Sequence, residues 1–204
     1  MILGGALAVV LAGCGGSGHK ATATTSSVVT RATTVGSSAP EPAITRRLLT
    51  SSEMPAGFSA QGQPSVSSTI AQWVQQVVSP SNSPQSETAR LKRIGFVAAA
   101  SLNLNSSQGD GISLVEQFRS PAGPRSELAN TLATVDGGPP GQVRFSVPAI
   151  PHSAGFGAPG SDNGVNVAFA DGDYYYVVGE QPNAPANRAG VVASAETLYH
   201  RVRG

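Results

Sequence analysis

The sequence predicts an α+β domain: one antiparallel sheet with helices packed on one of its faces. Three observations lead to this prediction. In several short segments apolar residues alternate with polar ones, as they do in half-buried strands. In others they recur every three or four residues, as on one face of a helix. The two patterns follow each other as hairpin and then helix, twice, over residues 96–135 and 165–203. Two such ββα-like units favour a sheet with helices on one face and its other face free.

Four segments carry the helical pattern. They cover residues 70–78, 85–94, 121–135 and 186–202. Trp73 lies on the apolar stripe of the first segment, so we expect it in the core. Ser120-Pro121 precedes the third segment and is typical of a helix start. Arg201 lies in the last turn of the fourth, where a positive side chain complements the helix dipole.

The strand pattern also occupies four segments. They cover residues 96–104, 112–119, 165–169 and 174–181. Asp171-Gly172 predicts a tight hairpin between the last two, because both residues tolerate the positive φ that such turns require. Residues 107–111 (SQGDG) predict a looser turn between the first two.

Tyr174, Tyr175 and Tyr176 are consecutive residues of the last predicted strand. Because consecutive strand residues point to opposite faces, a sheet covered on one side cannot bury all three. We therefore expect at least one ring to point outward. Such a ring either shields the strand edge or stacks on a sugar or a partner protein.

Residues 148–164 predict a long loop rich in Gly and Pro, which can carry function. Residues 155–160 match Gly-x-Gly-x-x-Gly, but the strand and helix that a dinucleotide site needs are missing, so we predict no cofactor. His152 is the better candidate for a catalytic base because it stands beside Ser153. No third group is indicated, and His200 at a helix end is expected to be solvated, so an enzyme is not predicted.

The composition excludes several classes of partner and site for this chain. The 204 residues contain 13 Lys and Arg against 12 Asp and Glu, a net charge of +1, so no basic surface for nucleic acid is expected. The single cysteine cannot form an internal disulfide, and no Cys/His spacing suggests a metal site. Residues 43–204 have the length of one domain.

The first 13 residues, MILGGALAVVLAG, are uncharged and too short to span a bilayer as a helix, but they suit the core of a signal peptide. Leu11-Ala12-Gly13-Cys14 follows and resembles the lipobox of bacterial lipoproteins. The resemblance implies cleavage before Cys14 and lipidation of its thiol, which would anchor the chain to a membrane. No basic residue precedes Lys20, although signal peptides begin with one, so we expect the true start to lie upstream of Met1.

Residues 15–42 are dominated by Gly, Ser, Thr and Ala and predict a disordered tether. Together with Cys14 it would hold the domain about 30 Å from the membrane on average. Arginine makes up 11 of the 13 basic residues, which suggests a GC-rich genome such as that of an actinobacterium. Residues 48–58 (LLTSSEMPAGF) resemble a segment of actinobacterial secreted lipoproteins of unknown function. The resemblance implies an extracytoplasmic location and a fold, but it identifies no active site.

These features predict a lipid-anchored extracytoplasmic lipoprotein that binds or senses a ligand of the cell envelope. Its candidate ligand-binding residues are Tyr174, Tyr175, Tyr176 and His152. Its expected partners are the membrane, through Cys14, and a small molecule or a protein of the envelope. The alternative is a structural lipoprotein that docks on another envelope protein, and an envelope hydrolase is less favoured.

Overall fold

The computed structural model describes residues 42–77, 83–107, 109–138, 142–157, 164–182 and 187–204. The predicted signal peptide, Cys14 and the tether up to residue 41 lie outside the described residues. Within the described part of the chain, no helix is long and apolar enough to cross a membrane.

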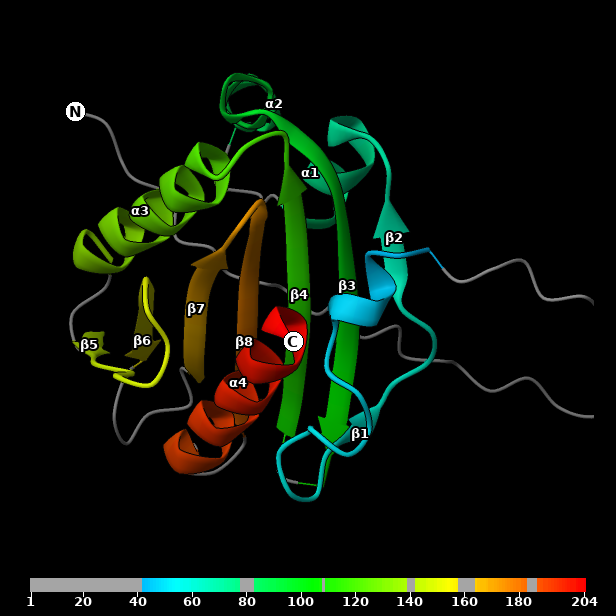
Figure 1. The fold of residues 1–204 in the computed structure, drawn as a ribbon, viewed down its shortest axis with the longest axis vertical. Coiled ribbons are helices and arrows are strands. Elements are labelled where there is room, and N and C mark those ends of the chain that lie inside the picture. The colour runs from blue at the N-terminus through cyan, green and yellow to red at the C-terminus, as the bar shows by residue number, and fades with distance from the viewer. Residues whose placement is uncertain (1–41, 78–82, 108, 139–141, 158–163, 183–186) are drawn as a thin grey trace, which may run out of the picture.

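One antiparallel sheet of eight strands forms the centre of the domain (Figure 1). The strands are β1 (Ser59–Ala60), β2 (Ser65–Ser67), β3 (Phe96–Ser106), β4 (Gly109–Phe118), β5 (Val143–Phe145), β6 (Ser153–Gly157), β7 (Val165–Asp171) and β8 (Tyr174–Pro182). Their order is β1-β3-β4-β8-β7-β6-β5, and β2 also pairs with β3. The two predicted hairpins, β3-β4 and β7-β8, therefore lie side by side, because β4 of the first pairs with β8 of the second in the middle of the sheet.

The helices are η1 (Thr45–Arg47), α1 (Ile70–Val77), α2 (Pro84–Ile94), α3 (Ala122–Asp136) and α4 (Arg188–Arg203). The four α-helices coincide with the four predicted segments to within a few residues. Ser83 and Asn187 cap α2 and α4, since each side chain accepts a hydrogen bond from a backbone N–H of the first turn. Gly95 ends α2 at φ 81°, a conformation that glycine adopts without strain.

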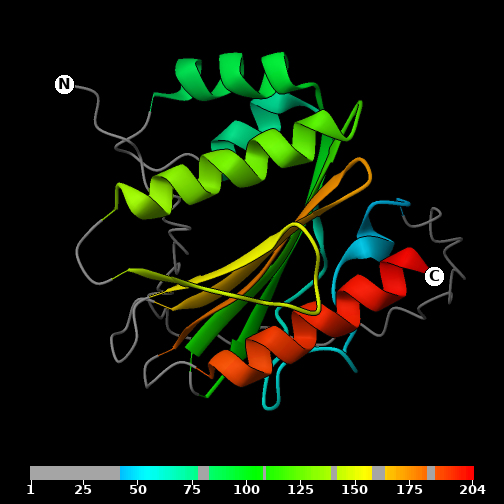
Figure 2. The ribbon, with the colours of Figure 1, turned by 60° about the vertical axis from the view of Figure 1, so that its left-hand side comes forward.

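The predicted α+β class and antiparallel sheet are confirmed, but the placement of all helices on one face is wrong. α1, α2 and α3 cover one face, whereas α4 and η1 cover the other, and Figure 2 shows the sheet between these layers. The physical reason is that the central strands are apolar on both sides. In β8, Tyr175 and Val177 join the core beneath α1–α3, while Tyr176 and Val178 join the core beneath α4.

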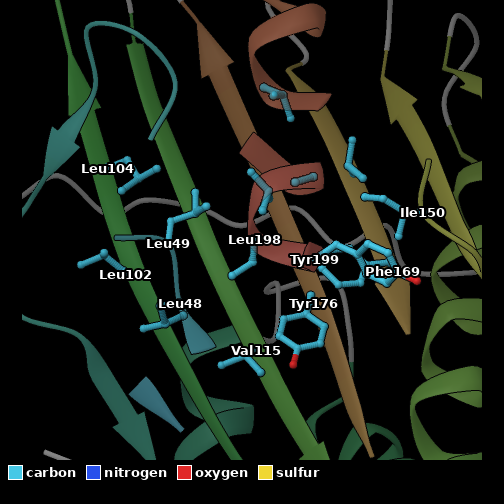
Figure 3. Close-up of a cluster of buried hydrophobic side chains, with 14 of the residues drawn as sticks. Leu48, Leu49, Leu102, Leu104, Val115, Ile150, Phe169, Tyr176, Leu198 and Tyr199 are labelled. Atoms are coloured by element: carbon cyan, nitrogen blue, oxygen red, sulfur yellow. The ribbon is translucent and has the colours of Figure 1, made fainter. Parts of the chain in front are cut away.

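The core beneath α4 contains the stacked rings of Phe169 and Tyr176, whose centroids are 4.6 Å apart. Tyr199 of α4 meets Phe169 edge-on at 5.8 Å. Figure 3 shows these rings together with Leu198 and the two leucines, Leu48 and Leu49, that follow η1. The segment 48–58 therefore begins with core residues of this face.

Arg201 ties that segment to α4. Its guanidinium donates to Glu53 Oε1 at 2.6 Å and to the backbone oxygens of Arg46 and Leu48, each at 2.5 Å. Glu53 Oε2 in turn accepts from the backbone N–H of Thr50 at 2.7 Å and closes a turn. Arg201 lies in the last turn of α4, as predicted, and also joins the two ends of the domain.

The predicted hairpin between β7 and β8 is confirmed, with Asp171 paired to Tyr174. Only Gly172, the first central residue of the turn, has a positive φ, as in a type II′ turn. The predicted loop 148–164 is partly wrong, because residues 153–157 form β6. Gly155 allows this strand to pair closely with β5, since a Cβ there would lie 1.9 Å from the ring of Phe145.

Candidate functional site

A group of buried and half-buried polar and charged side chains lies between the sheet and the layer formed by α1, α2 and α3. Glu116 of β4 and Tyr175 of β8 are direct neighbours in the sheet, and five side chains from the three helices surround them. We call this group the Glu116 cluster; its members are Trp73, Glu87, Arg90, Glu116, Glu127, Thr131 and Tyr175.

Local sequence explains why these polar groups point inward. Leu114, Glu116 and Phe118 alternate along β4, so the carboxyl group of Glu116 lies on the same face as two buried apolar side chains. On α3, Glu127 precedes the buried Leu128 and lies one turn before Thr131. On α2, Arg90 adjoins Leu91, the buried residue that packs this helix on the sheet.

Glu116 is the least satisfied member of the cluster. Glu116 is only 5% exposed. Trp73 Nε1 donates a hydrogen bond to its Oε1 at 2.5 Å. Its Oε2 is fully buried and has no hydrogen-bond partner among the described residues. Because an indole nitrogen can only donate, Oε1 is an acceptor, and a proton held by this carboxyl group resides on Oε2. A buried polar atom without a partner is unfavourable by about 1–3 kcal/mol.

Arg90 joins two helices on the outer side of the cluster. It donates to Glu87 of its own helix at 2.5 and 2.8 Å, and to both carboxylate oxygens of Glu127 on α3. This forked pairing is the geometry that favours strong Arg–carboxylate contacts. Behind it, the Tyr175 hydroxyl and Thr131 Oγ1 share a hydrogen bond of 2.8 Å.

Burial dominates the electrostatics of the cluster. Burial raises the pKa of Glu116 well above 4.5, and the charge of Glu127 raises it further, against the smaller opposite effect of the Trp73 hydrogen bond. Burial also raises the pKa of Glu127, although the Arg90 charge acts in the opposite direction. Burial and the charge of Glu127 raise the pKa of Tyr175. Glu116 therefore holds its proton to a higher pH than a free glutamic acid does, and its carboxyl group shares the surroundings of one guanidinium with those of Glu87 and Glu127.

This arrangement suits recognition more than covalent chemistry. Three carboxyl groups, those of Glu87, Glu116 and Glu127, face one cation, Arg90, so the cluster favours positive or hydrogen-bond-donating groups and disfavours anions. Glu116 Oε2 donates a hydrogen bond when it is protonated and accepts one when it is ionised. Among the described residues, no group of three or more His, Cys, Asp or Glu side chains is arranged to hold a metal ion.

The three predicted tyrosines occupy three different environments. Tyr175 lies in the Glu116 cluster, and Tyr176 is buried on the opposite face, where Arg47 Nη1 donates to its hydroxyl at 2.6 Å. Tyr174 is half-buried, and the guanidinium of Arg47 lies 3.8 Å from its ring centroid. The expectation that at least one ring points outward assumed a free sheet face. Both faces are covered, so Tyr175 and Tyr176 are buried and Tyr174 is the one ring of the three that stays partly exposed.

His152 is exposed and precedes β6, with a φ of 52°. Its carbonyl accepts from Ala170 N–H at 3.1 Å, so its backbone holds the loop against β7. The hydroxyl of Ser153 donates to the carbonyls of Ile150 and Val147, at 2.5 and 3.2 Å. The structure therefore does not pair Ser153 with His152 as a nucleophile and base. A role of His152 in ligand binding stays a prediction.

Sequence reasoning placed Trp73 in the core, and this is confirmed, but it missed Glu116, Glu127 and Arg90. One signal for Glu116 was available: a carboxylate stood on the apolar face of a predicted strand, between Leu114 and Phe118. No comparable signal existed for Arg90 and Glu127, because their pairing joins helices that are 37 residues apart in sequence.

Comparisons with known proteins identify a similar fold but give no information about the Glu116 cluster. No protein-family model matches the chain, and no curated protein matches it. Among solved structures, the fold is similar to that of the extracellular domain of PknH from Mycobacterium tuberculosis, with a TM-score of 0.53 at 14% identity. The similarity covers 78% of this chain and 94% of that domain. At this identity it concerns the fold alone.

Proposed function

We propose that this chain is a lipid-anchored lipoprotein on the extracytoplasmic face of a cell membrane, where its domain binds or senses a small envelope ligand. Cys14 carries the anchor, and residues 15–42 form the tether. The similarity to an extracellular domain supports the extracytoplasmic address. The sequence around Cys14 supports the anchor.

The Glu116 cluster is the observation that carries the binding function. Its buried, unpartnered Oε2 is a hydrogen-bonding group that the described fold does not use, and such groups are rare in native proteins. A ligand that supplies a partner to Oε2 would remove this unfavourable term. Because the cluster contains more carboxyl groups than cations, the ligand that fits it carries no net negative charge. It offers Oε2 an acceptor while Glu116 is protonated and a donor when Glu116 is ionised, and an amide group can do both.

Native mass spectrometry of the domain, released by protease from its own envelope, tests this function. We expect an added small-molecule mass on the wild-type domain and its loss from the Glu116→Leu variant. Glu196→Leu on α4 is the matched control and is expected to keep the ligand. A bare mass for the wild-type domain would contradict the binding function and favour docking on an envelope protein.

The anchor has a separate test, since Cys14→Ala removes the thiol to which lipid is attached. We expect the variant to leave the membrane fraction or to stay uncleaved, whereas Ser17→Ala stays processed and membrane-bound. Processing and membrane retention of the Cys14→Ala variant would contradict the anchor. The two tests are independent, because the first uses the domain after its tether has been cut.

A further inference from the structure

Four exposed cations gather at one end of the domain, outside the Glu116 cluster. They are Lys92, Arg93, Arg119 and Arg125, and we call them the cationic end. The end of α2, the end of β4 and the start of α3 carry these residues and lie together along the upper edge of the domain in Figure 1.

Contacts between the backbones show how close these segments are. The carbonyl of Gly95, two residues after Arg93, accepts from Arg119 N–H at 2.9 Å. A Cβ on Gly123, two residues before Arg125, would lie 2.7 Å from the carbonyl oxygen of Ile94. Two stretches that are distant in sequence, the end of α2 with residues 92–95 and the β4–α3 connection with residues 119–125, thus lie against each other and carry the four cations.

The positive charge of this surface is not neutralised by the fold. The ion pairs of the described residues involve Arg90, Arg144, Arg201 and Arg203, and none involves the cationic end. Asp173 lies nearby, since its carbonyl accepts from Phe118 N–H at 2.9 Å, but its carboxylate forms no ion pair with these cations.

Stability of the helices explains only part of this arrangement. Lys92 and Arg93 lie in the last turn of α2, where cations are favourable. Arg125 lies near the start of α3, where a cation is unfavourable and where the first turn has no acidic residue. Arg119 lies between β4 and α3 and is exposed. Four clustered cations are also unexpected in a chain whose net charge is +1.

We infer that the cationic end docks the domain on the surface of an anionic phospholipid bilayer. This inference rests on the proposed anchor, because the 28 residues from 15 to 42 would hold the domain about 30 Å from the membrane on average. At that distance even a weak attraction acts at a high effective concentration. Each basic residue near an anionic surface contributes about 1 kcal/mol, or about a fivefold change in binding. Charge complementarity therefore favours a lipid surface over an uncharged partner.

Fluorescence quenching on vesicles tests the docking with the full lipidated chain. Since Cys14 is the only cysteine and carries the lipid, a Ser120→Cys variant accepts a single fluorophore beside Arg119. Gln61→Cys is the control position, since Gln61 N–H bonds to the Asn103 carbonyl near the opposite end of β3. That end is about 25 Å from the start of β3. The vesicles contain a nitroxide-labelled lipid and are either phosphatidylglycerol-rich or purely phosphatidylcholine.

We expect quenching at position 120 on the anionic vesicles, little on the neutral ones, and little at position 61 on either. The double variant Arg119→Gln/Arg125→Gln should lower the ratio of docked to free domain about 25-fold. Salt at 1 M screens all four cations and should lower this ratio more than the double variant does. Arg46→Gln, which neutralises an exposed arginine elsewhere, should leave it unchanged.

Sedimentation of the same samples separates docking from anchoring. Binding to both vesicle types without quenching at position 120 would support the anchor and overturn the docking. Binding to anionic vesicles alone, with quenching at position 120, would support the docking and contradict the anchor. Binding to neither would overturn both. If soluble polyphosphate changes the fluorescence of the label at position 120 and the vesicles do not quench it, the cationic end binds a soluble polyanion. That result would overturn docking on the bilayer.

Discussion

Replacing Glu116 by Gln should change how the stability of the domain depends on pH. Burial raises the pKa of Glu116 above 4.5 in the folded chain. The folded state therefore holds a proton that the unfolded state releases, so stability falls as pH rises from about 4.5 towards the folded-state pKa. The slope is about 1.4 kcal/mol per pH unit. Gln keeps the acceptor for Trp73 but does not titrate. The free energy of unfolding of Glu116→Gln relative to wild type should therefore rise with pH between about 4.5 and the folded-state pKa of Glu116, by at most about 1.4 kcal/mol per pH unit.

Urea denaturation at pH 4.5, 5.5, 6.5 and 7.5 measures this difference. Using the difference between variants cancels the contribution of Glu180, whose pKa burial also raises. Glu127 interacts electrostatically with Glu116, so the difference reports the titration of the two groups together. Glu116→Leu should show the same pH dependence as Gln, but lie about 1–3 kcal/mol lower at every pH because Trp73 Nε1 loses its acceptor. Glu196→Gln on α4 is the matched control. A difference between Glu116→Gln and wild type that stays constant from pH 4.5 to 7.5 would refute the reasoning.

Three further predictions concern other contacts. Trp73→Phe removes the indole N–H and should lower the free energy of unfolding by about 1–3 kcal/mol in urea; a neutral effect would show that the bond to its carboxyl partner is unimportant. Arg201→Ala leaves the buried Glu53 without its positive partner and should cost about 2–3 kcal/mol, with faster hydrogen exchange in residues 44–53; unchanged exchange would contradict this contact. Gly155→Ala forces the ring of Phe145 to move and should cost about 1–3 kcal/mol by thermal unfolding, whereas an unchanged Tm would disprove the close packing.

Local pattern was sufficient for most elements and insufficient for the short ones. α4 and the β7-β8 hairpin carry their own periodicity and turn chemistry, so their existence followed from a few neighbouring residues. β1, β2 and β5 have two or three residues each and exist only because longer strands offer them a partner. No window of sequence contains that information.

The candidate site shows the same division. The inward position of Glu116 could be read from the alternation in β4, but its partners could not. Trp73 reaches it from α1, across 43 residues of sequence, and the Arg90–Glu127 pair spans 37. Such contacts depend on how the helices cross the sheet, which side-chain spacing within one helix does not encode.

The sequence by itself determined the α+β class, the antiparallel hairpins, the four helices and the core position of Trp73, because each depends on residues close together in the chain. Only the tertiary structure decided on which face each helix packs. The central strands are apolar on both sides, so either face could receive a helix, and the packing of whole elements made the choice. That choice buried Tyr175 and Tyr176 on opposite faces. It also enclosed Glu116 beneath α1–α3, where one of its oxygens has no partner in the part of the chain that the structure describes.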